Sequence, residues 1–194
     1  MRLEAVREQL SGYQAANSAE AGFVERMLEL TRSEGAWERS HFAPGHFTAS
    51  AFVLSPDRRE LVLIHHKKLG IWVQPGGHVE ATDEDPISAA RREVLEEVGL
   101  AELEPLSSPG RPLLFDVDIH LIPARKAEPA HEHFDLRFAF VARTRELVIS
   151  EEVSDLRWVA LSDVEQLGCD ESVLRAVRKL GALGVPGVPG VPGG

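Results

Sequence analysis

The spacing of apolar residues predicts a helical start to the chain. Helical spacing recurs in two stretches, Leu3–Tyr13 and Phe23–Leu30. Asn17 and Glu20 have the spacing of a capping box for the second helix. Two short amphipathic helices are rarely stable alone, so we expect residues 1–35 to form an N-terminal helical extension that packs on the following domain or on a partner subunit.

The pattern changes from helix to strand after a polar linker at residues 36–46. Alternating or continuous apolar runs predict strands at 47–55, 60–66 and 71–74. The first two runs are joined by a turn at Pro56–Arg59, so they predict a hairpin. These strands open the main domain, which we place at residues 47–181.

A helix after the glycine corner Pro75–Gly77 is well specified by local chemistry. Asp85 suits the N-cap and Pro86 the first helical position, while Gly99 suits the left-handed residue after the last turn. The sequence therefore predicts a helix over Pro86–Val98.

The second half of the chain predicts two more strands and two short helices. A strand is expected at 113–124, where Asp116, Asp118 and His120 alternate onto one face, as on the wet side of a sheet. The stretch after it leads into an apolar strand that ends near Ala142. Ser162 with Glu165 predicts a capping box for one short helix, and Asp170 predicts the N-cap of a second. The Pro- and Gly-rich residues 182–194 predict a flexible tail.

The charge and cysteine content limit the possible functions. The chain has 31 Asp and Glu against 21 Lys and Arg, a formal net charge of −10. This charge disfavours broad binding to DNA or to an anionic membrane and suits a site that concentrates a divalent cation. The single cysteine, Cys169, cannot form an intrachain disulfide, so we expect a cytoplasmic protein.

Three glutamates of the predicted helix form a candidate metal site. Glu93, Glu96 and Glu97 are three or four residues apart, so they share one helix face. Carboxylates this close repel one another unless a cation lies among them, and oxygen ligands select a hard ion such as Mg²⁺ or Mn²⁺. A solvated acidic helix face is the alternative that spacing alone leaves open.

The whole stretch from Gly77 to Leu100 resembles the signature of the Nudix hydrolases. That signature reads Gly, five residues, Glu, seven residues, Arg-Glu, an aliphatic residue, any residue, Glu-Glu, any residue, Gly and an aliphatic residue. Arg92–Leu100 matches its second half at every position, and Glu84 stands eight residues before Arg92. Six residues separate Gly77 from Glu84 instead of five, which we interpret as an insertion in an exposed loop. Asp83 and Glu84 both remain candidates for the first signature acid.

The resemblance covers about Thr48 to Leu161 and implies both a fold and an activity. It implies an α/β fold, an α/β/α sandwich with a mixed β-sheet, to which the N-terminal helical extension is added. It also implies hydrolysis of a diphosphate linked to another group, most simply a nucleotide-type substrate, by attack of water. The implied metal ligands are Gly77, through its carbonyl, with Glu93, Glu96 and Glu97. The implied catalytic residues are Glu93, which orients or deprotonates the water, Glu97, and Arg92, which pairs with a signature glutamate.

Substrate contacts are expected from residues outside the signature. A lysine of the 67–68 pair is a candidate for phosphate, and Trp72, Phe134 or Trp158 for stacking on a base. An additional carboxylate ligand or base is expected among Glu132, Asp135 and Glu152. The candidate substrate-binding residues are Lys67, Trp72, His131, His133, Glu132 and Asp135.

The histidines after residue 119 allow three interpretations. His131 and His133 are two apart in an extended segment, so both rings lie on one side. With His120 they form a second metal site, a substrate-contacting group, or ordinary hydrogen-bonded residues at the mouth of a pocket.

Two other functional classes remain as alternatives to the enzyme. A catalytically silent protein with the Nudix fold would bind a ligand or regulate, but it has no electrostatic reason to keep three acids together. The related isomerase that acts on isoprenyl diphosphates relies on a cysteine in the pocket region, and Cys169 comes too late in the chain. The partners that we expect are a small-molecule diphosphate substrate and, through the extension, a second copy in a homodimer, without DNA or a membrane.

Overall fold

Two structural units divide the part of the chain that the computed structural model describes, residues 2–67, 70–106, 113–125, 128–151 and 153–188. The first unit comprises Met1–Ser50, Gly76–Arg92 and Ser107–Phe138. The second unit comprises Ala51–Pro75, Glu93–Leu106 and Ala139–Gly194. Strand β1 (Gly45–Leu54) and helix α3 (Pro86–Val98) continue along the chain from one unit into the other.

The first unit contains the predicted N-terminal helices and two antiparallel strand pairs. Its other elements are α1 (Arg2–Gly12), α2 (Ser18–Leu30), η1 (Glu34–Trp37), β4 (Gly76–His78), β6 (Leu114–Ile122) and most of β7 (His131–Ala142). In β6 and β7 the paired residues run from Leu114 opposite Phe138 to Ile122 opposite His131. In β1 and β4, Thr48 lies opposite His78.

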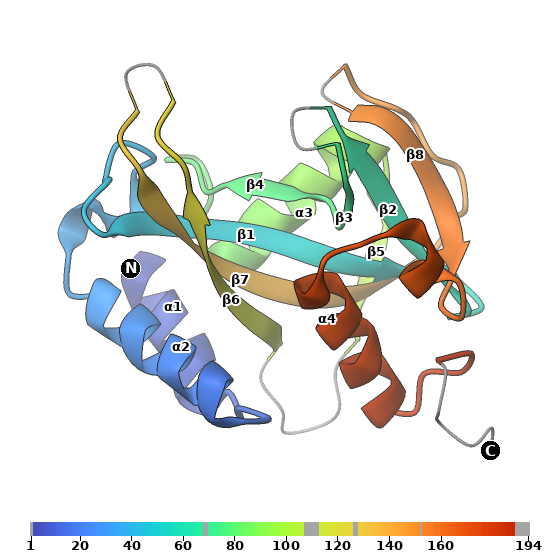
Figure 1. The fold of residues 1–194 in the computed structure, drawn as a ribbon, viewed down its shortest axis with the longest axis horizontal. Coiled ribbons are helices and arrows are strands. Elements are labelled where there is room, and N and C mark those ends of the chain that lie inside the picture. The colour runs from blue at the N-terminus through green and yellow to red at the C-terminus, as the bar shows by residue number, and fades with distance from the viewer. Residues whose placement is uncertain (1, 68–69, 107–112, 126–127, 152, 189–194) are drawn as a thin grey trace. The chain divides into compact units, whose positions relative to one another are not determined.

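The N-terminal extension packs on strands of its own chain. The Asn17 half of the predicted capping box is present, since the Asn17 side chain accepts a hydrogen bond from the Glu20 backbone N–H at 3.0 Å. Glu20 is buried, and its carboxylate accepts hydrogen bonds from the Tyr13 hydroxyl and the Ala16 backbone N–H, both at 2.9 Å. Helix α2 lies against β6, as Figure 1 shows, and the side chain of Gln9 accepts a hydrogen bond from the Leu114 backbone.

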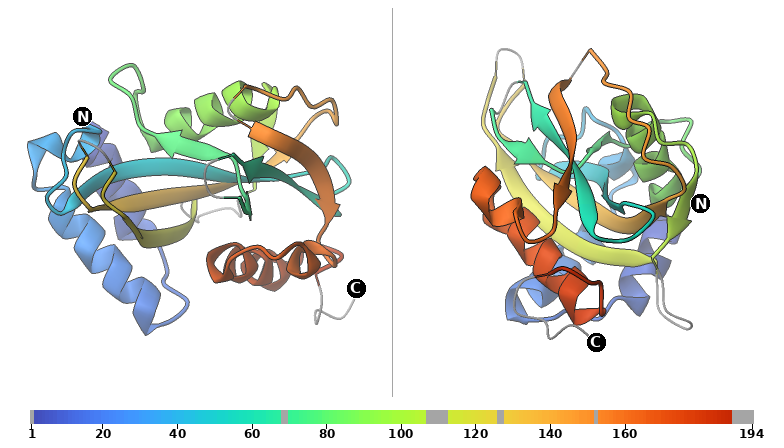
Figure 2. Two further views of the ribbon diagram at one scale, coloured as in Figure 1. Left: turned by 45° about the horizontal axis from the view of Figure 1, so that its top comes forward. Right: turned by 90° about the vertical axis from the view of Figure 1, so that its right-hand side faces the viewer.

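The second unit contains the predicted hairpin and a three-strand group. Its elements, besides the ends of β1, β7 and α3, are β2 (Glu60–His66), β3 (Trp72–Val73), β5 (Leu103–Pro105), β8 (Val153–Ala160), η2 (Val164–Leu167) and α4 (Glu171–Ala182). Strand β2 runs between β3 and β8 (Figure 2) and pairs antiparallel with both. Strand β5, which the sequence did not predict, pairs with the end of β7, Leu103 opposite Ala142.

Local capping is predicted correctly at one C-terminal helix and wrongly at the other. Asp170 caps α4, because its carboxylate accepts a hydrogen bond from the Val173 N–H at 3.0 Å. The predicted capping box of Ser162 and Glu165 is wrong: η2 begins after Asp163 without a side-chain cap, and the Ser162 hydroxyl donates to the Asp163 carboxylate instead.

The region after α4 is partly packed. Val185 and Val188 are buried, and the Val185 N–H donates to the Leu180 carbonyl. The predicted flexible tail, 182–194, therefore begins with packed residues, and its last part, 189–194, lies outside the described residues. Within the described residues, no helix has the length and apolar character needed to cross a membrane.

Candidate active site

Helix α3 forms where the local chemistry predicts it. The Asp85 carboxylate accepts a hydrogen bond from the Ser88 N–H at 2.7 Å and so caps the first turn. Gly99 follows the last turn with φ of 76°, the left-handed conformation that favours glycine. Ala90, Val94 and Val98 form the buried stripe of the helix.

The three acids of α3 lie away from this buried stripe. Glu93 and Glu97 are half-buried and Glu96 is exposed, so all three lie on the side of the helix that solvent reaches. All three belong to the last two turns, where the helix dipole disfavours negative charge, and the last turn contains no basic residue.

A pair of hydrogen bonds joins α3 to the loop before it. The Arg92 guanidinium donates to both carboxylate oxygens of Asp83, at 3.1 Å each, and to the His78 carbonyl at 2.8 Å. Asp83 is buried and also accepts a hydrogen bond from the Glu80 N–H, whereas Glu84 is exposed. Arg92 therefore pairs with Asp83, and the pairing with a signature glutamate that the resemblance implies stays a prediction.

Asp83 and Glu84 place the extra residue of the signature on different sides of the first acid. Five residues, 78–82, separate Gly77 from Asp83, as the signature requires. Eight residues, 84–91, then separate Asp83 from Arg92, one more than in the signature. With Asp83 as the first acid the extra residue follows that acid, whereas with Glu84 it precedes it, so the interpretation of an insertion before Glu84 stays a prediction.

The glycine corner lies directly against strand β1. Ser50 pairs with Gly76 and Ala49 with Gly77. A Cβ at Gly76 would lie 2.3 Å from the Cβ of Ser50, so only glycine allows this approach. The extension and the linker both contact the following loop: Arg2 of the extension donates to the Asp83 carbonyl at 2.8 Å, and the Trp37 indole N–H of the linker donates to the Glu80 carbonyl at 2.8 Å.

A scan against protein-family models matches the NUDIX domain over residues 44–179 of this chain. The chain belongs to the Nudix hydrolase family. This confirms the family and the enzyme class predicted from the sequence, a Nudix-type pyrophosphohydrolase, and the α/β fold with its mixed sheet. No curated protein matched in the corresponding sequence comparison.

Solved structures of Nudix proteins resemble this chain over about the same region. A Nudix-family hydrolase from Clostridium perfringens is 25% identical, with 71% of this chain and 97% of that chain covered and a TM-score of 0.53. The E. coli dihydroneopterin triphosphate pyrophosphohydrolase is 17% identical, with 69% and 92% covered and a TM-score of 0.54. The Nudix domain of Shewanella oneidensis NrtR, complexed with ADP ribose, is 20% identical, with 69% and 84% covered and a TM-score of 0.50.

Two of the predicted substrate residues of this Nudix domain lie in the second unit. Lys67 donates a hydrogen bond to the Glu151 carbonyl from an exposed turn. Trp72 is half-buried, with the Arg157 guanidinium 4.4 Å from its ring centroid. Neither contact tests the predicted roles, so phosphate binding by Lys67 and base stacking by Trp72 stay predictions. Lys68 and Glu152 lie outside the described residues.

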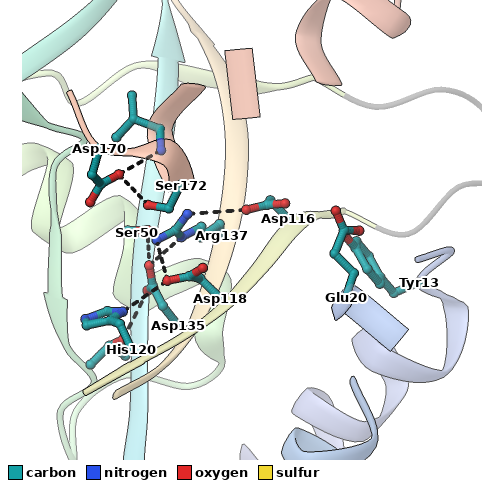
Figure 3. Close-up of polar contacts among 12 residues, drawn as sticks. Tyr13, Glu20, Ser50, Asp116, Asp118, His120, Asp135, Arg137, Asp170 and Ser172 are labelled. Atoms are coloured by element: carbon teal, nitrogen blue, oxygen red, sulfur yellow. Dashed lines mark hydrogen bonds and ion pairs between the residues drawn. The ribbon is translucent and has the colours of Figure 1, made fainter. Parts of the chain in front are cut away.

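Asp135 belongs to a buried charge network that the sequence did not predict. Its carboxylate accepts hydrogen bonds from Thr48 at 3.0 Å, Ser50 at 2.8 Å and Arg137 at 2.8 Å. Arg137 also pairs with Asp116 at 3.4 Å and Asp118 at 3.1 Å, so it lies among three carboxylates (Figure 3). This arrangement favours a structural role for Asp135 over the predicted substrate contact.

The network also corrects the interpretation of strand β6. Asp116 and Asp118 do share a face, but that face is buried and not wet. Burial alone would lower the pKa of Arg137, but the carboxylates of Asp135, Asp118 and Asp116 raise it, so the guanidinium stays charged. His120 extends the network at the exposed end, with its Nδ1 3.2 Å from the Asp118 carboxylate.

Four other histidines of the first unit lie around His133. Its ring centroid lies 4.9 Å from that of His46, 5.0 Å from His78, 5.3 Å from His131 and 5.4 Å from His120. The predicted proximity of His120, His131 and His133 is therefore confirmed, and His46 and His78 were missed. Nothing in local spacing connects them, because β1, β4, β6 and β7 bring them together from distant parts of the chain.

Burial makes several of these rings poor bases. It lowers the pKa of His133 to about 2 and that of His78 to about 4, with neighbouring histidines and, for His78, also Arg39 adding to the effect. Burial also lowers the pKa of His46. These rings are therefore neutral at pH 7. The side chain of Glu132, another predicted substrate residue, pairs with Arg26 beside this cluster.

Proposed function

We propose that this Nudix protein hydrolyses a diphosphate linkage in a nucleotide-type substrate, a nucleoside diphosphate linked to another group, with Mg²⁺ or Mn²⁺ as cofactor. The observation that carries the proposal is the set of three acids at the C-terminal end of α3. Glu93, Glu96 and Glu97 lie where the helix dipole disfavours them, and local sequence rules otherwise hold along this helix.

The donor atoms in this region fit a hard divalent cation. The carboxylates of Glu93, Glu96 and Glu97 would hold it, and oxygen donors are those that Mg²⁺ and Mn²⁺ prefer. The Gly77 carbonyl stays the further ligand that the family signature implies. When bound, such an ion neutralises phosphate charge and lowers the pKa of a coordinated water.

The residues of the chain have separate roles in this proposal. A carboxylate oxygen of Glu93 accepts the proton of the attacking water, which is the general-base role. Glu97 contributes a further carboxylate oxygen to the cation. Arg92 touches Asp83 and the loop backbone, so it acts by holding the glycine corner in register with the helix. Lys67 binds a phosphate oxygen and Trp72 stacks on the base in the same proposal.

The partner and location complete the proposal. In this proposal the partner is the small-molecule diphosphate substrate. The proposed compartment is the cytoplasm, because the single cysteine of the chain cannot form an intrachain disulfide. The predicted homodimer stays a prediction, as does the absence of DNA or membrane partners.

A hydrolysis screen of the full chain tests the function. The panel contains nucleoside triphosphates, dinucleoside polyphosphates, nucleotide sugars and dinucleotide cofactors, with ADP-ribose and dihydroneopterin triphosphate added because they are named for structurally similar Nudix proteins. Each compound is incubated with Mg²⁺ or Mn²⁺, and the phosphate-containing products are separated and identified. We expect cleavage within a diphosphate, with ¹⁸O from labelled water in one phosphate product.

The screen also discriminates the silent alternative. Tight binding of one panel compound without turnover, with either metal, would favour a ligand-binding or regulatory Nudix protein. Cleavage of a phosphate monoester with every diphosphate left intact would contradict the proposed reaction class.

A further inference from the structure

Three histidines of the first unit have ring nitrogens that lie close together. His46 lies on β1, and His131 and His133 lie two residues apart on β7, on the same side of the strand. The ligand atoms that these side chains offer all lie within 4.8 Å of one another. Bound to one zinc ion at about 2.0–2.1 Å each, such atoms would be closer still.

The backbone holds these strands together at this point. The Glu132 N–H, between the two β7 histidines, donates to the Pro44 carbonyl at 3.0 Å. A Cβ at Gly45 would lie 1.8 Å from the Glu132 carbonyl oxygen, so the glycine allows this close approach. The position of His46 relative to His131 and His133 is therefore fixed by main-chain contacts.

Backbone carbonyls orient two of the rings in the manner of metal-binding histidines. Nδ1 of His46 lies 3.2 Å from the His41 carbonyl oxygen, and Nδ1 of His131 lies 2.8 Å from the Pro129 carbonyl oxygen. A carbonyl only accepts, so each Nδ1 carries a hydrogen, and in the neutral form of either ring the lone pair lies on Nε2. Metal-bound histidines are held in this way, with the other ring nitrogen donating to a carbonyl or carboxylate.

The Nε2 atom of His46 is a buried polar atom that lacks a hydrogen-bond partner among the described residues. His46 is 1% exposed, and its Nε2 is buried without a hydrogen-bond partner in the part of the chain that the structure describes. Buried polar atoms normally have a partner, so this atom requires an explanation. A cation that accepts its lone pair supplies one.

The charges around the cluster permit a cation, and one side of it is open. Arg39, which lies close enough to affect His78, pairs with Glu128 at 3.1 Å, so its charge is compensated. The Arg26 charge is compensated in the same way by Glu132. His133 is half-buried and the neighbouring His120 is exposed, which gives an ion a route from solvent.

We propose that His46, His131 and His133 form a binding site for a transition-metal ion of the Zn²⁺ type, built from residues other than the acids of α3. Imidazole nitrogens suit Zn²⁺, Co²⁺ and Ni²⁺, whereas the oxygen donors of the helix suit Mg²⁺ and Mn²⁺. Three protein ligands leave a fourth position, which water or the adjacent His78 fills. The bound ion links β1 to β7 and stabilises the first unit. This site does not depend on the proposed hydrolase function.

Titration of the full chain with Co²⁺ after treatment with a chelator tests the site. Tetrahedral nitrogen coordination of Co²⁺ gives visible absorption bands, and calorimetry with Zn²⁺ gives the stoichiometry and affinity. We expect one Co²⁺ per chain at this site. His133→Gln and His131→Gln should each weaken binding by more than about 100-fold, since even loss of an outer hydrogen bond to a ligand costs about 10–100-fold.

Two control variants keep the test specific. His65→Gln removes a histidine of the second unit, and it should leave the affinity unchanged. Glu97→Gln alters the helix acids, and it should leave the Co²⁺ spectrum unchanged. Zn²⁺ should also raise the melting temperature of the unmodified chain and not that of His133→Gln. The half-buried His133 is the principal variant, because His46→Gln changes a fully buried position.

Three different results would contradict the proposed metal site. Absence of Co²⁺ or Zn²⁺ binding by the unmodified chain would overturn the proposal. So would an affinity that His131→Gln and His133→Gln leave unchanged, or a spectrum that disappears in Glu97→Gln alone, because the ion would then belong to the acids of α3.

Discussion

Asp83 and Arg92 form a two-point ion pair, in which the guanidinium Nε and Nη2 each lie 3.1 Å from a different carboxylate oxygen of Asp83. The pair is largely removed from solvent, with the side chains of Asp83 and Arg92 5% and 18% exposed. The same guanidinium donates to the His78 carbonyl. Asp83 therefore ties the loop after the glycine corner to the helix that carries the acids.

Replacing Asp83 should destabilise the protein more than replacing its neighbour. Asp83→Asn removes the charge that Arg92 requires, and we expect a loss of about 2–3 kcal/mol in the free energy of unfolding, with lower kcat. Glu84→Gln makes a similar change one residue later on an exposed side chain, and should stay within about 0.5 kcal/mol. Chemical denaturation of both variants measures this. Equal effects, or a larger effect at Glu84, would return Glu84 to the role of first signature acid.

The buried network around Arg137 provides a second prediction. Arg137→Met leaves Asp116, Asp118 and Asp135 without their shared cation, and we expect a destabilisation of about 3–5 kcal/mol. Arg143→Met is the control, because Arg143 is 61% exposed in its ion pair with Glu104 and should contribute less than about 1 kcal/mol. Similar melting temperatures for the two variants would show that the network contributes little to stability.

The reactivity of Cys169 should be low and should rise with pH. Burial, with the nearby Asp170 carboxylate, raises the pKa of its thiol from 9.0 to about 11. Only the thiolate is alkylated, so at pH 8 the folded chain should react with iodoacetamide about 100-fold more slowly than the chain unfolded in urea. The rate for the folded chain should increase about tenfold per pH unit until pH approaches 11. A rate that levels off near pH 8 would contradict the raised pKa.

The elements whose limits depend on neighbouring residues could be predicted from the sequence. Asp85, Pro86 and Gly99 specify α3 through hydrogen bonds and backbone conformations within a few residues, and the helix has the predicted limits. The strands of the hairpin followed from alternation and a turn. The prediction of a capping box at Ser162 was wrong because the Ser162 hydroxyl donates to the Asp163 carboxylate, and η2 begins after Asp163 without a side-chain cap.

The parts that depend on pairing between strands could not be predicted. Asp116 and Asp118 have the alternation of a solvated face, and only the position of Arg137 on the neighbouring strand explains why that face is buried. His46 joins His131 across 85 residues of sequence, through a strand contact that no local pattern encodes. The sequence left Asp83 and Glu84 as equal candidates, and the burial and ion pair of Asp83 depend on contacts that the local sequence does not specify.

The steady-state rate of the Glu97→Gln variant tests the central claim most directly. The substrate is the compound that the screen selects, the cation is Mg²⁺ or Mn²⁺, and Glu102→Gln, which changes an exposed acid near the end of the same helix, is the matched control. A chelator should abolish turnover by the unmodified chain, and restoring the cation should recover it. We expect kcat of Glu97→Gln to fall by at least about 100-fold with an unchanged melting temperature, while Glu102→Gln keeps the normal rate. A folded Glu97→Gln variant with near-normal kcat would contradict the assignment of the α3 acids as the catalytic metal site.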